Sequence, residues 1–360
     1  MRDYERAAAA FSAGQGAQFA EIKAGHINAT YRMDGEQGSL ILQKVNTFVF
    51  RDPDVLMNNI FGVTRFLREK LLQRGEDPER RVLEFLPTLD GRLYYADPDG
   101  GVWRAYRYVD GVKAFDRTES PELFRRTGEA FGRFQLLLAE YPADGLGETI
   151  PFFHHTGKRL DALEQALKLD SAGRAQEVAA EAEAFLSRRE KLTSIVRMLE
   201  DGSVPVRVTH NDTKINNVLM DEATGEALAV IDLDTVMPGS VLYDFGDAIR
   251  TGANAADEDE RDVSKVVMDL KLFRAFCEGF LPCVRDVLTP AERAALPLSA
   301  IVMTAEVGVR FLTDYLNGDV YFKTEYAEHN LVRARAQLTL MRDMEQKETE
   351  MMRIVEEILR

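Results

Sequence analysis

Acidic and amide side chains gather in one stretch of the sequence, at a spacing that fits phosphoryl transfer. Asp212 and Asn217 lie five residues apart in the string HNDTKINN (210–217), and Asp232 follows Asn217 by fifteen residues. Phosphoryl transfer requires a carboxylate that orients the attacking hydroxyl and accepts its proton, and oxygen ligands that hold Mg²⁺ across the nucleotide phosphates. We therefore predict Asp212 as the catalytic base, and Asn217 and Asp232 as the magnesium ligands.

A lysine and a second acidic motif lie close to these residues. Lys214 follows Asp212 by two residues, where its ammonium could point at the transferring phosphoryl group. Asp244 opens the tripeptide DFG, which carries the metal-binding aspartate in protein kinases, but it lies too far along the chain to end a short hairpin. We expect Asp232 to bind the metal and Asp244 to hold the catalytic loop by hydrogen bonds. The alternative is a polar turn between strands, because Asp and Asn are common in turns.

Residues for nucleotide binding are expected in the first third of the chain. Gly25, His26 and Asn28 belong to the string GHINAT between two predicted strands, where a loop that covers phosphates would lie. Lys44 is on the next strand, from which it could reach the α- and β-phosphates, or else simply face solvent. The expected glutamate partner of this lysine is missing, because the following helix carries Asn58 and Asn59 near that place.

These residues are positioned by two regimes of local structure. Up to about residue 110, short segments rich in β-branched and aromatic residues alternate with turns, and one helix begins at Pro53; the predicted strands are 18–24, 29–33, 40–45, 93–96 and 102–109. The string WRAYRYVDG (103–111) ends this regime, and its Tyr106 and Tyr108 are predicted to line an adenine pocket.

Beyond residue 117 the apolar spacing is mostly helical. Helices are predicted at 121–141, 156–169, 176–199, 263–280, 299–317 and 324–360, and a β-hairpin with a turn at Gly225 lies within 206–232. We predict an α+β, protein-kinase-like bilobal fold. Its small, β-rich N-terminal lobe with one helix would span residues 1–109, and its larger helical C-terminal lobe would span residues 110–360.

Composition limits the class of partner and the compartment. With 60 acidic and 45 basic residues, the chain has a net charge of -15, which argues against nucleic acid as a partner. The acidic string at 254–262 is predicted to be solvated surface. We find no apolar run of the roughly 20 residues that a membrane span requires, and a charged N-terminus and only two cysteines, Cys277 and Cys283, favour the cytoplasm.

Several strings resemble the aminoglycoside phosphotransferase superfamily, which includes choline, homoserine and sugar kinases, and are most similar to N-acetylhexosamine 1-kinases. They are GHIN (25–28), LQKVN (42–46), HNDTKINN (210–217), IDLDTVMPG (231–239), YDFGDAIR (243–250) and VRFLTDYLNGDVYFK (309–323). The resemblance implies phosphorylation, with ATP and Mg²⁺, of the anomeric hydroxyl of N-acetylglucosamine or N-acetylgalactosamine. It also implies that Asp234, Arg310 and Tyr321 contact the small-molecule sugar substrate.

Two other functions stay open at this point. One is a kinase for another small hydroxyl compound, such as an amino alcohol, methylthioribose or an aminoglycoside. The other is a nucleotide-binding pseudokinase that serves as an interaction module. The presence of Asp212, Asn217 and Asp232 together argues against a pseudokinase, which usually lacks one of them.

Overall fold

The computed structural model describes residues 2–11, 17–22, 27–35, 38–254 and 256–360. The chain forms two compact units, each assembled from separate segments. Unit 1 comprises Met1–Ala114, Glu140–Pro151 and Val218–Pro238, and unit 2 comprises Phe115–Ala139, Phe152–Asn217 and Gly239–Arg360. The hairpin that follows the catalytic loop thus packs with unit 1, whereas the predicted boundary after residue 109 is a single cut and stays a prediction.

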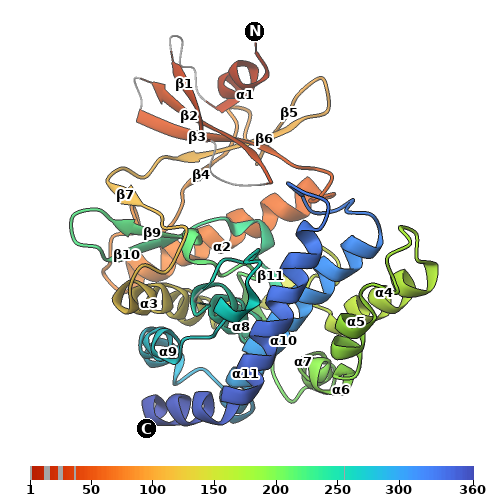
Figure 1. Ribbon diagram of the computed structural model, residues 1–360. Helices are drawn as coiled ribbons and strands as arrows, with labels where there is room; N and C mark the ends of the chain where they lie inside the picture. The colour runs from red at the N-terminus through yellow and green to blue at the C-terminus, as the bar shows by residue number, and fades with distance from the viewer. Residues whose placement is uncertain (1, 12–16, 23–26, 36–37, 255) are drawn as a thin grey trace. The chain divides into compact units, whose positions relative to one another are not determined.

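Unit 1 is built on an antiparallel sheet whose spatial order is β1-β2-β3-β6-β4, with β5 paired to β6 (Figure 1). The strands are β1 (Gln18–Ile22), β2 (Ala29–Gly35), β3 (Gly38–Val45), β4 (Phe85–Leu86), β5 (Tyr95–Ala96) and β6 (Val102–Arg107). In β3 and β6, Leu42 pairs with Ala105 and Lys44 pairs with Trp103. Because side chains alternate along a strand, these four residues share one face of the sheet.

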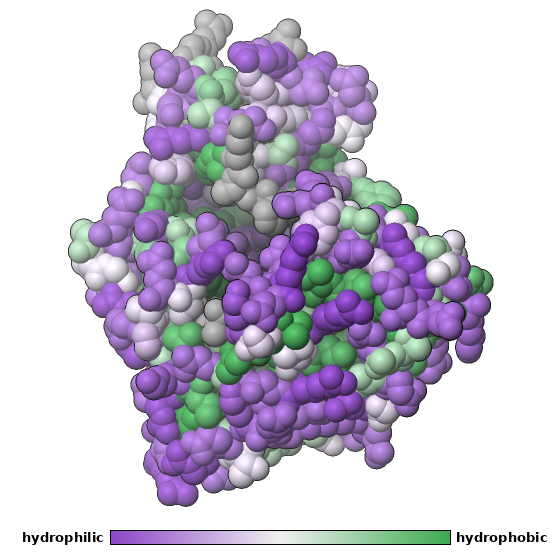
Figure 2. Space-filling view, viewed as in Figure 1, coloured by the Kyte–Doolittle hydropathy of each residue, from purple (hydrophilic) through white to green (hydrophobic). Residues whose placement is uncertain are grey.

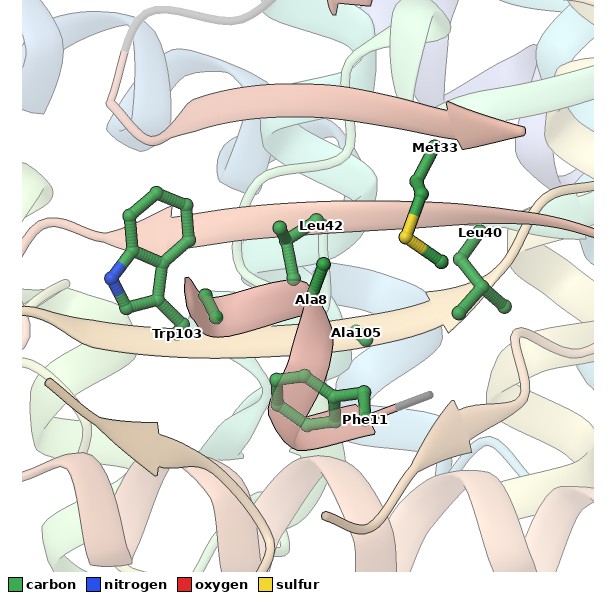
Figure 3. Close-up of a cluster of buried hydrophobic side chains, with 8 residues drawn as sticks. Ala8, Phe11, Met33, Leu40, Leu42, Trp103 and Ala105 are labelled. Carbon is green, nitrogen blue, oxygen red and sulfur yellow. The ribbon is translucent and has the colours of Figure 1, made fainter. Parts of the chain in front are cut away.

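Helix α1 (Asp3–Phe11) covers that face, so the prediction of a single helix in residues 1–109 is wrong. Figure 3 shows its Ala8 and Phe11 against Met33, Leu42 and Trp103 of the strands. The opposite face carries Gln43, Arg104 and Tyr106 and is contacted through Phe85 by Phe61 of helix α2 (Pro53–Gln73), with ring centroids 6.1 Å apart. The N-terminus of α2 is capped by Asp52, which accepts hydrogen bonds from two backbone N–H groups.

The predicted hairpin is present in unit 1. Strands β9 (Val218–Asp221) and β10 (Ala227–Val230) pair antiparallel, and β7 (Val112–Lys113) adds to β9. The turn between them places Gly225 at φ 68, in the left-handed region that glycine favours. Val218 pairs with Val230, so the returning strand ends two residues before Asp232. A single 3₁₀ turn, η3 (Leu233–Thr235), follows at once.

Unit 2 is largely helical, as predicted. Its helices are α3 (Pro121–Leu138), α4 (Thr156–Leu169), α5 (Ala179–Leu186), α6 (Arg189–Leu192), α7 (Ser194–Glu200), α8 (Val241–Gly252), α9 (Leu270–Val284), α10 (Pro290–Leu316) and α11 (His329–Leu359). Two short strands, β8 (Arg207–Thr209) and β11 (Met237–Gly239), flank the catalytic region in the sequence.

The structure corrects four predicted helices. The helix expected at 263–280 begins only at Leu270, which Asp269 caps, and the helix expected at 299–317 begins nine residues earlier, at Pro290, which Thr289 caps. The helix expected at 176–199 is three short ones, because Thr193 and Ser194 direct their hydroxyls to the carbonyls of Arg189 and Lys191 at the break. The helix expected from residue 324 begins only at His329, whose Nδ1 accepts a hydrogen bond from the backbone N–H of Glu325.

The prediction that no apolar segment has the length of a membrane span is wrong for α10. Among the described residues, this helix is the one long and apolar enough to cross a membrane, with a mean hydropathy of 1.5 over its most apolar window. In the protein, 89% of that window is buried, as in the core helix of a folded domain.

The face shown in Figure 2 is mainly hydrophilic, with scattered hydrophobic patches.

Close helix packing positions α8, which carries Asp244. A Cβ atom at Gly246 would lie 2.4 Å from the carbonyl oxygen of Ser299 on α10, so only glycine permits this approach. Gly279 of α9 is equally tight against α3, where a Cβ atom would lie 1.8 Å from the carbonyl oxygen of Arg125. The sequence YDFGDAIR is therefore a buried helix rather than a metal-binding loop.

Candidate active site

The loop that carries Asp212 is held by hydrogen bonds to the carboxylate of Asp244. Asp244 accepts hydrogen bonds from the backbone N–H groups of His210 (3.0 Å) and Asn211 (2.7 Å) and from the side-chain amide of Gln135 (2.6 Å). Asp244 is buried, and burial raises its pKa against the lowering effect of these bonds. The prediction that Asp244 holds the catalytic loop by hydrogen bonds is confirmed.

Replacing Asp244 by Ala is expected to destabilise the protein without removing its response to Mg²⁺. The change removes the acceptor of three buried donors, and each buried donor left unsatisfied costs about 1–3 kcal/mol. We expect urea denaturation to give a free energy of unfolding lower by about 3 kcal/mol. Asp244→Asn keeps one oxygen and should lose less. Unchanged stability combined with a lost Mg²⁺ response would instead make Asp244 a metal ligand.

Helix α8 holds the same loop at a second point that sequence reasoning missed. The backbone N–H of Thr213 donates to Asp247 Oδ2 at 3.0 Å, and Asp247 Oδ1 accepts from Arg250 Nε at 3.0 Å. Arg250 also pairs with Glu258 at 2.7 Å. The signal was present in the string YDFGDAIR, because aspartate and arginine three residues apart lie on the same side of a helix.

The sequence predicts the acidic string at 254–262 as solvated surface, but three of its carboxylates contact side chains outside the string. Besides the bond from Glu258 to Arg250, Asp257 pairs with Arg117 at 2.8 Å and Asp259 contacts His329 Nε2 at 3.1 Å. Two of these partners, Arg117 and His329, are distant in sequence, and they connect to the rest of unit 2 a loop whose composition alone indicates solvation.

Asp212 lies in this anchored loop with both carboxylate oxygens engaged. Its Oδ1 lies 2.8 Å from Lys214 Nζ, and its Oδ2 accepts from Asn217 Nδ2 at 3.2 Å. Asn217 Nδ2 also donates to the Asp212 carbonyl at 2.8 Å. Burial raises the pKa of Asp212, but the charge and hydrogen bond of Lys214, together with the charges of His210 and Arg250, lower it further, so the carboxylate is ionised at neutral pH. The Asp212 charge in turn raises the pKa of Lys214.

His210 supports the loop and does not reach outward. It is fully buried, with its ring 5.7 Å from that of Phe131 and 5.9 Å from that of Phe134, and its Nδ1 accepts a hydrogen bond from the backbone N–H of Asp212 at 3.3 Å. The residue before Asp212, Asn211, has a left-handed backbone with φ 65. Together these features fix the backbone direction at Asp212.

Asp232 and Asp234 lie in unit 1, at the end of the hairpin. Asp232 has a left-handed backbone, φ 58 and ψ 59, and precedes the turn η3. Asp234 is buried, and its carboxylate accepts a hydrogen bond from Asn28 Nδ2 at 2.7 Å and pairs with Arg104. The structure therefore places a bent backbone and two carboxylates where the sequence predicts metal and substrate ligands.

Comparison with known proteins identifies the family. The family model described as the phosphotransferase enzyme family matches residues 18–265. The chain belongs to this family. The predicted superfamily is thereby confirmed, and the protein is a phosphotransferase.

Solved structures share the fold of this phosphotransferase at low sequence identity. An amicoumacin kinase in complex with AMP-PNP and Ca²⁺ has a TM-score of 0.62 and 18% identity, over 94% of this chain and 93% of that one. A microcompartment-associated aminopropanol kinase has a TM-score of 0.61 and 17% identity, over 96% and 97%. A choline kinase from Cryptosporidium parvum Iowa II has a TM-score of 0.56 and 14% identity, over 95% and 93%. The predicted α+β, kinase-like fold class is confirmed.

The structure places the predicted nucleotide-binding lysine of the phosphotransferase on the α1 face of the sheet. Lys44 Nζ lies 3.8 Å from Asp3 Oδ2 of α1 and 5.5 Å from the centroid of the Trp103 ring. Asp3 is thus the acidic partner that the sequence did not reveal. The role of Lys44 at the phosphates stays a prediction.

The other predicted nucleotide-binding residues are spread over both faces. Tyr106 is on the opposite face from Lys44, with its ring 5.0 Å from that of Phe85, and burial raises its pKa. Tyr108 lies under the guanidinium of Arg32, with Cζ 4.1 Å from the ring centroid. Gly25 and His26 lie outside the described residues, whereas their neighbour Asn28 contacts Asp234 as above.

The phosphotransferase brings the predicted substrate residues Arg310 and Tyr321 together within unit 2. The Arg310 guanidinium carbon lies 6.0 Å from the centroid of Tyr321 and 5.5 Å from those of Phe153 and Phe322. Tyr321 is 57% exposed, and its backbone N–H donates to Asp314 Oδ1 at 2.8 Å. A buried aspartate on α10 thus orders the loop that presents Tyr321 to solvent.

Proposed function

We propose that this phosphotransferase is a cytoplasmic, ATP- and Mg²⁺-dependent kinase that phosphorylates the anomeric hydroxyl of N-acetylglucosamine or N-acetylgalactosamine. The observation that carries the proposal is the Asp212 carboxylate, which is kept ionised by Lys214 and held by Asn217. Its loop is anchored at three backbone N–H groups by α8. A carboxylate fixed in this way can orient a hydroxyl for attack on a phosphoryl group.

We propose Asn217 and Asp232 as the protein ligands of a magnesium ion that would be held jointly with substrate phosphates. Asn217 uses its NH₂ group on Asp212, which leaves Oδ1 for a cation, and Asp232 supplies a carboxylate. Among the described residues there is no cluster of three or more His, Cys, Asp or Glu side chains able to hold a metal ion. Mg²⁺ does not need one, because it usually takes one or two protein carboxylates plus phosphates and water. When bound, the ion would neutralise charge on the phosphates.

Asp212 and Lys214 would act directly on the reacting groups, the first on the acceptor hydroxyl and the second on the phosphoryl group. Asp212 would accept a hydrogen bond from the acceptor hydroxyl and take its proton as the new oxygen–phosphorus bond forms. Lys214, already paired with Asp212 at 2.8 Å, would place positive charge beside the phosphoryl group. Both residues come from one anchored loop, so their separation is fixed before substrate binds.

The charge around Arg310 favours an uncharged acceptor over a cationic one. In the described part of the chain, Arg310 has no carboxylate within ion-pair distance. Burial lowers the pKa of neighbouring Arg159, and the charge of Arg310 lowers it further, which places the two guanidiniums within electrostatic reach. The buried Glu306 carboxylate raises the pKa of Arg159 in turn, so the guanidinium of Arg310 itself carries the preference: its charge disfavours a cationic acceptor beside it, and its donors suit sugar hydroxyl and acetamide oxygens.

Phosphorus NMR of the reaction product tests the proposal. With ATP, Mg²⁺ and N-acetylglucosamine or N-acetylgalactosamine, we expect a phosphate on the anomeric carbon, whereas the 1-deoxy analogue should bind without accepting phosphate. Choline, aminopropanol and an aminoglycoside serve as cationic comparators under the same conditions and should give little ADP. A phosphate on the 6-hydroxyl, or turnover of only the cationic compounds, would refute the sugar 1-kinase assignment and leave the family intact.

A further inference from the structure

A buried ion pair connects residues 232–236 of unit 1, which include the proposed metal ligand Asp232, to the sheet of the same unit. Asp234 and Arg104 are 3% and 2% exposed, although they lie 130 residues apart in the sequence. Arg104 Nη1 donates to Asp234 Oδ1, and Asn28 Nδ2 donates to Asp234 Oδ2 at 2.7 Å. Both oxygens of Asp234 are therefore occupied by side chains from strands of one sheet or their edge.

Arg104 is itself locked in the sheet and has little freedom to move. Its Nε and Nη2 donate to Gln43 Oε1 at 3.0 and 2.8 Å, across the pair that Gln43 and Arg104 form between β3 and β6. Gln43 in turn donates to Thr30 Oγ1 on β2 at 3.1 Å. Hydrogen bonds through Arg104 and Gln43 thus link Asp234 to the three neighbouring strands β2, β3 and β6.

The same segment is also tied to α2. Asn59 Nδ2 donates to the carbonyl oxygens of Val236 (2.9 Å) and Gly147 (2.8 Å), and the N–H of Gly147 donates back to Asn59 Oδ1 at 3.1 Å. Asn59 lies near the place on α2 where a glutamate for Lys44 was expected. Residues 232–236 are thus held at Asp234 by the sheet and at Val236 by the helix.

These bonds support Asp232, whose backbone is unusual. It lies in the left-handed region, with φ 58, which is uncommon for residues other than glycine but which aspartate and asparagine adopt more readily than most, so the bonds at Asp234 and Val236 add to a local preference. Burial lowers the pKa of Arg104, and the charges of Asp234 and Asp232 outweigh burial and raise it. Both carboxylates are thus within electrostatic reach of the same guanidinium.

We propose that Asp234, clamped by Arg104 and Asn28, is a positioning residue that fixes the Asp232 carboxylate for its metal, and not a sugar ligand. The inference rests on the proposed function, in which Asp232 holds Mg²⁺. The Asp234 side chain is only 4% exposed, against 27% for Asp212, and each of its oxygens already accepts a bond, so a sugar hydroxyl could reach it only if Arg104 or Asn28 moved. Partners that orient metal ligands in this way typically affect metal affinity by about 10- to 100-fold when mutated.

The test measures binding of Mn²⁺ or Mg²⁺ to the full chain with ATP, by calorimetry, together with Tm and the sugar KM at saturating metal. Asp234→Asn and Arg104→Lys should weaken metal binding about 10-fold or more, while the sugar KM stays unchanged. The double variant Arg104→Met/Asp234→Leu replaces the pair by apolar side chains that can pack in its place, so it should fold. Its metal binding should nevertheless be weakened as much as that of the single variants.

Asp97→Asn is the matched control for stability. Asp97 is another buried aspartate of unit 1 bonded to β6, through Trp103 Nε1 at 2.9 Å, but it lies on the α1 face of the sheet. We expect Asp97→Asn to lower Tm and leave the metal affinity unchanged. A raised sugar KM with normal metal affinity in Asp234→Asn, or a lowered Tm alone, overturns the inference. Absence of metal-dependent ATP binding in the wild type instead overturns the proposed function and the inference with it.

Discussion

Replacement of Asp212 by Asn is expected to lower kcat by about a hundredfold to ten thousandfold, the usual contribution of a general base. The substitution keeps an oxygen that can accept from Asn217, so the loop should keep its conformation. It removes the charge that attracts Lys214 and the group that would take the hydroxyl proton. Steady-state kinetics and ATP calorimetry would separate the two effects, because nucleotide binding should survive. Near-native turnover in Asp212→Asn would rule this residue out as the base.

The companion variant Lys214→Met probes the same carboxylate through pH. Burial raises the pKa of Asp212, and Lys214, with smaller contributions from His210 and Arg250, lowers it below its ordinary value, so the base is ionised well into the acid range. Without the ammonium only burial and more distant charges remain, and the pKa of Asp212 should rise. The acid limb of kcat/KM should therefore move to higher pH in Lys214→Met, and an unmoved limb would show that another group controls it.

Short-range spacing explains why the hairpin and the loop before it were predictable, whereas the catalytic and metal-binding roles of their residues stay predictions. Asp212, Asn217 and Asp232 belong to one loop and one hairpin, whose geometry depends on neighbouring residues and a Gly225 turn. The distinction between Asp232 and Asp244 followed from the same reasoning, because a hairpin return requires few residues and a helix was indicated for YDFGDAIR. The fold class was predictable for a similar reason, since the strand and helix patterns occupy separate parts of the chain.

Contacts across long stretches of sequence account for most of what was not predicted. Arg104 and Asp234 meet only when the sheet and the hairpin pack, and no local pattern indicates that pairing. The contacts of Lys44 depend on α1, because Ala7, Ala8 and Phe11 of this helix pack against the same face of the sheet and Asp3 lies near the lysine. Two partners of the acidic loop, Arg117 and His329, come from distant segments, and the third, Arg250, lies eight residues before Glu258. A carboxylate in the sequence thus indicates chemistry only after its burial and partners are known.

Replacement of Asp232 by Asn is expected to abolish productive binding of magnesium with ATP. Asn and Asp both tolerate the left-handed backbone that Asp232 adopts, with φ 58 and ψ 59, so the substitution should keep the turn and Tm close to the wild-type values. It removes one negative charge from a site where the ligand is a divalent cation, and the remaining amide oxygen is a weaker ligand. Calorimetry with ATP and graded Mg²⁺ should show binding that no longer responds to the metal.

Two further variants make the Asp232 result specific. Asp244→Asn should lower Tm and retain the Mg²⁺ response, the reverse of Asp232→Asn, because both oxygens of Asp244 accept hydrogen bonds from backbone N–H groups. The combined variant Asp212→Asn/Asp232→Asn should lose far less activity than the product of the single losses, since base and metal ligands act on the same transition state. If raising Mg²⁺ restored Asp244→Asn and left Asp232→Asn with native metal dependence, the metal ligand would be Asp244. Multiplicative losses would mean that Asp212 and Asp232 act at separate steps.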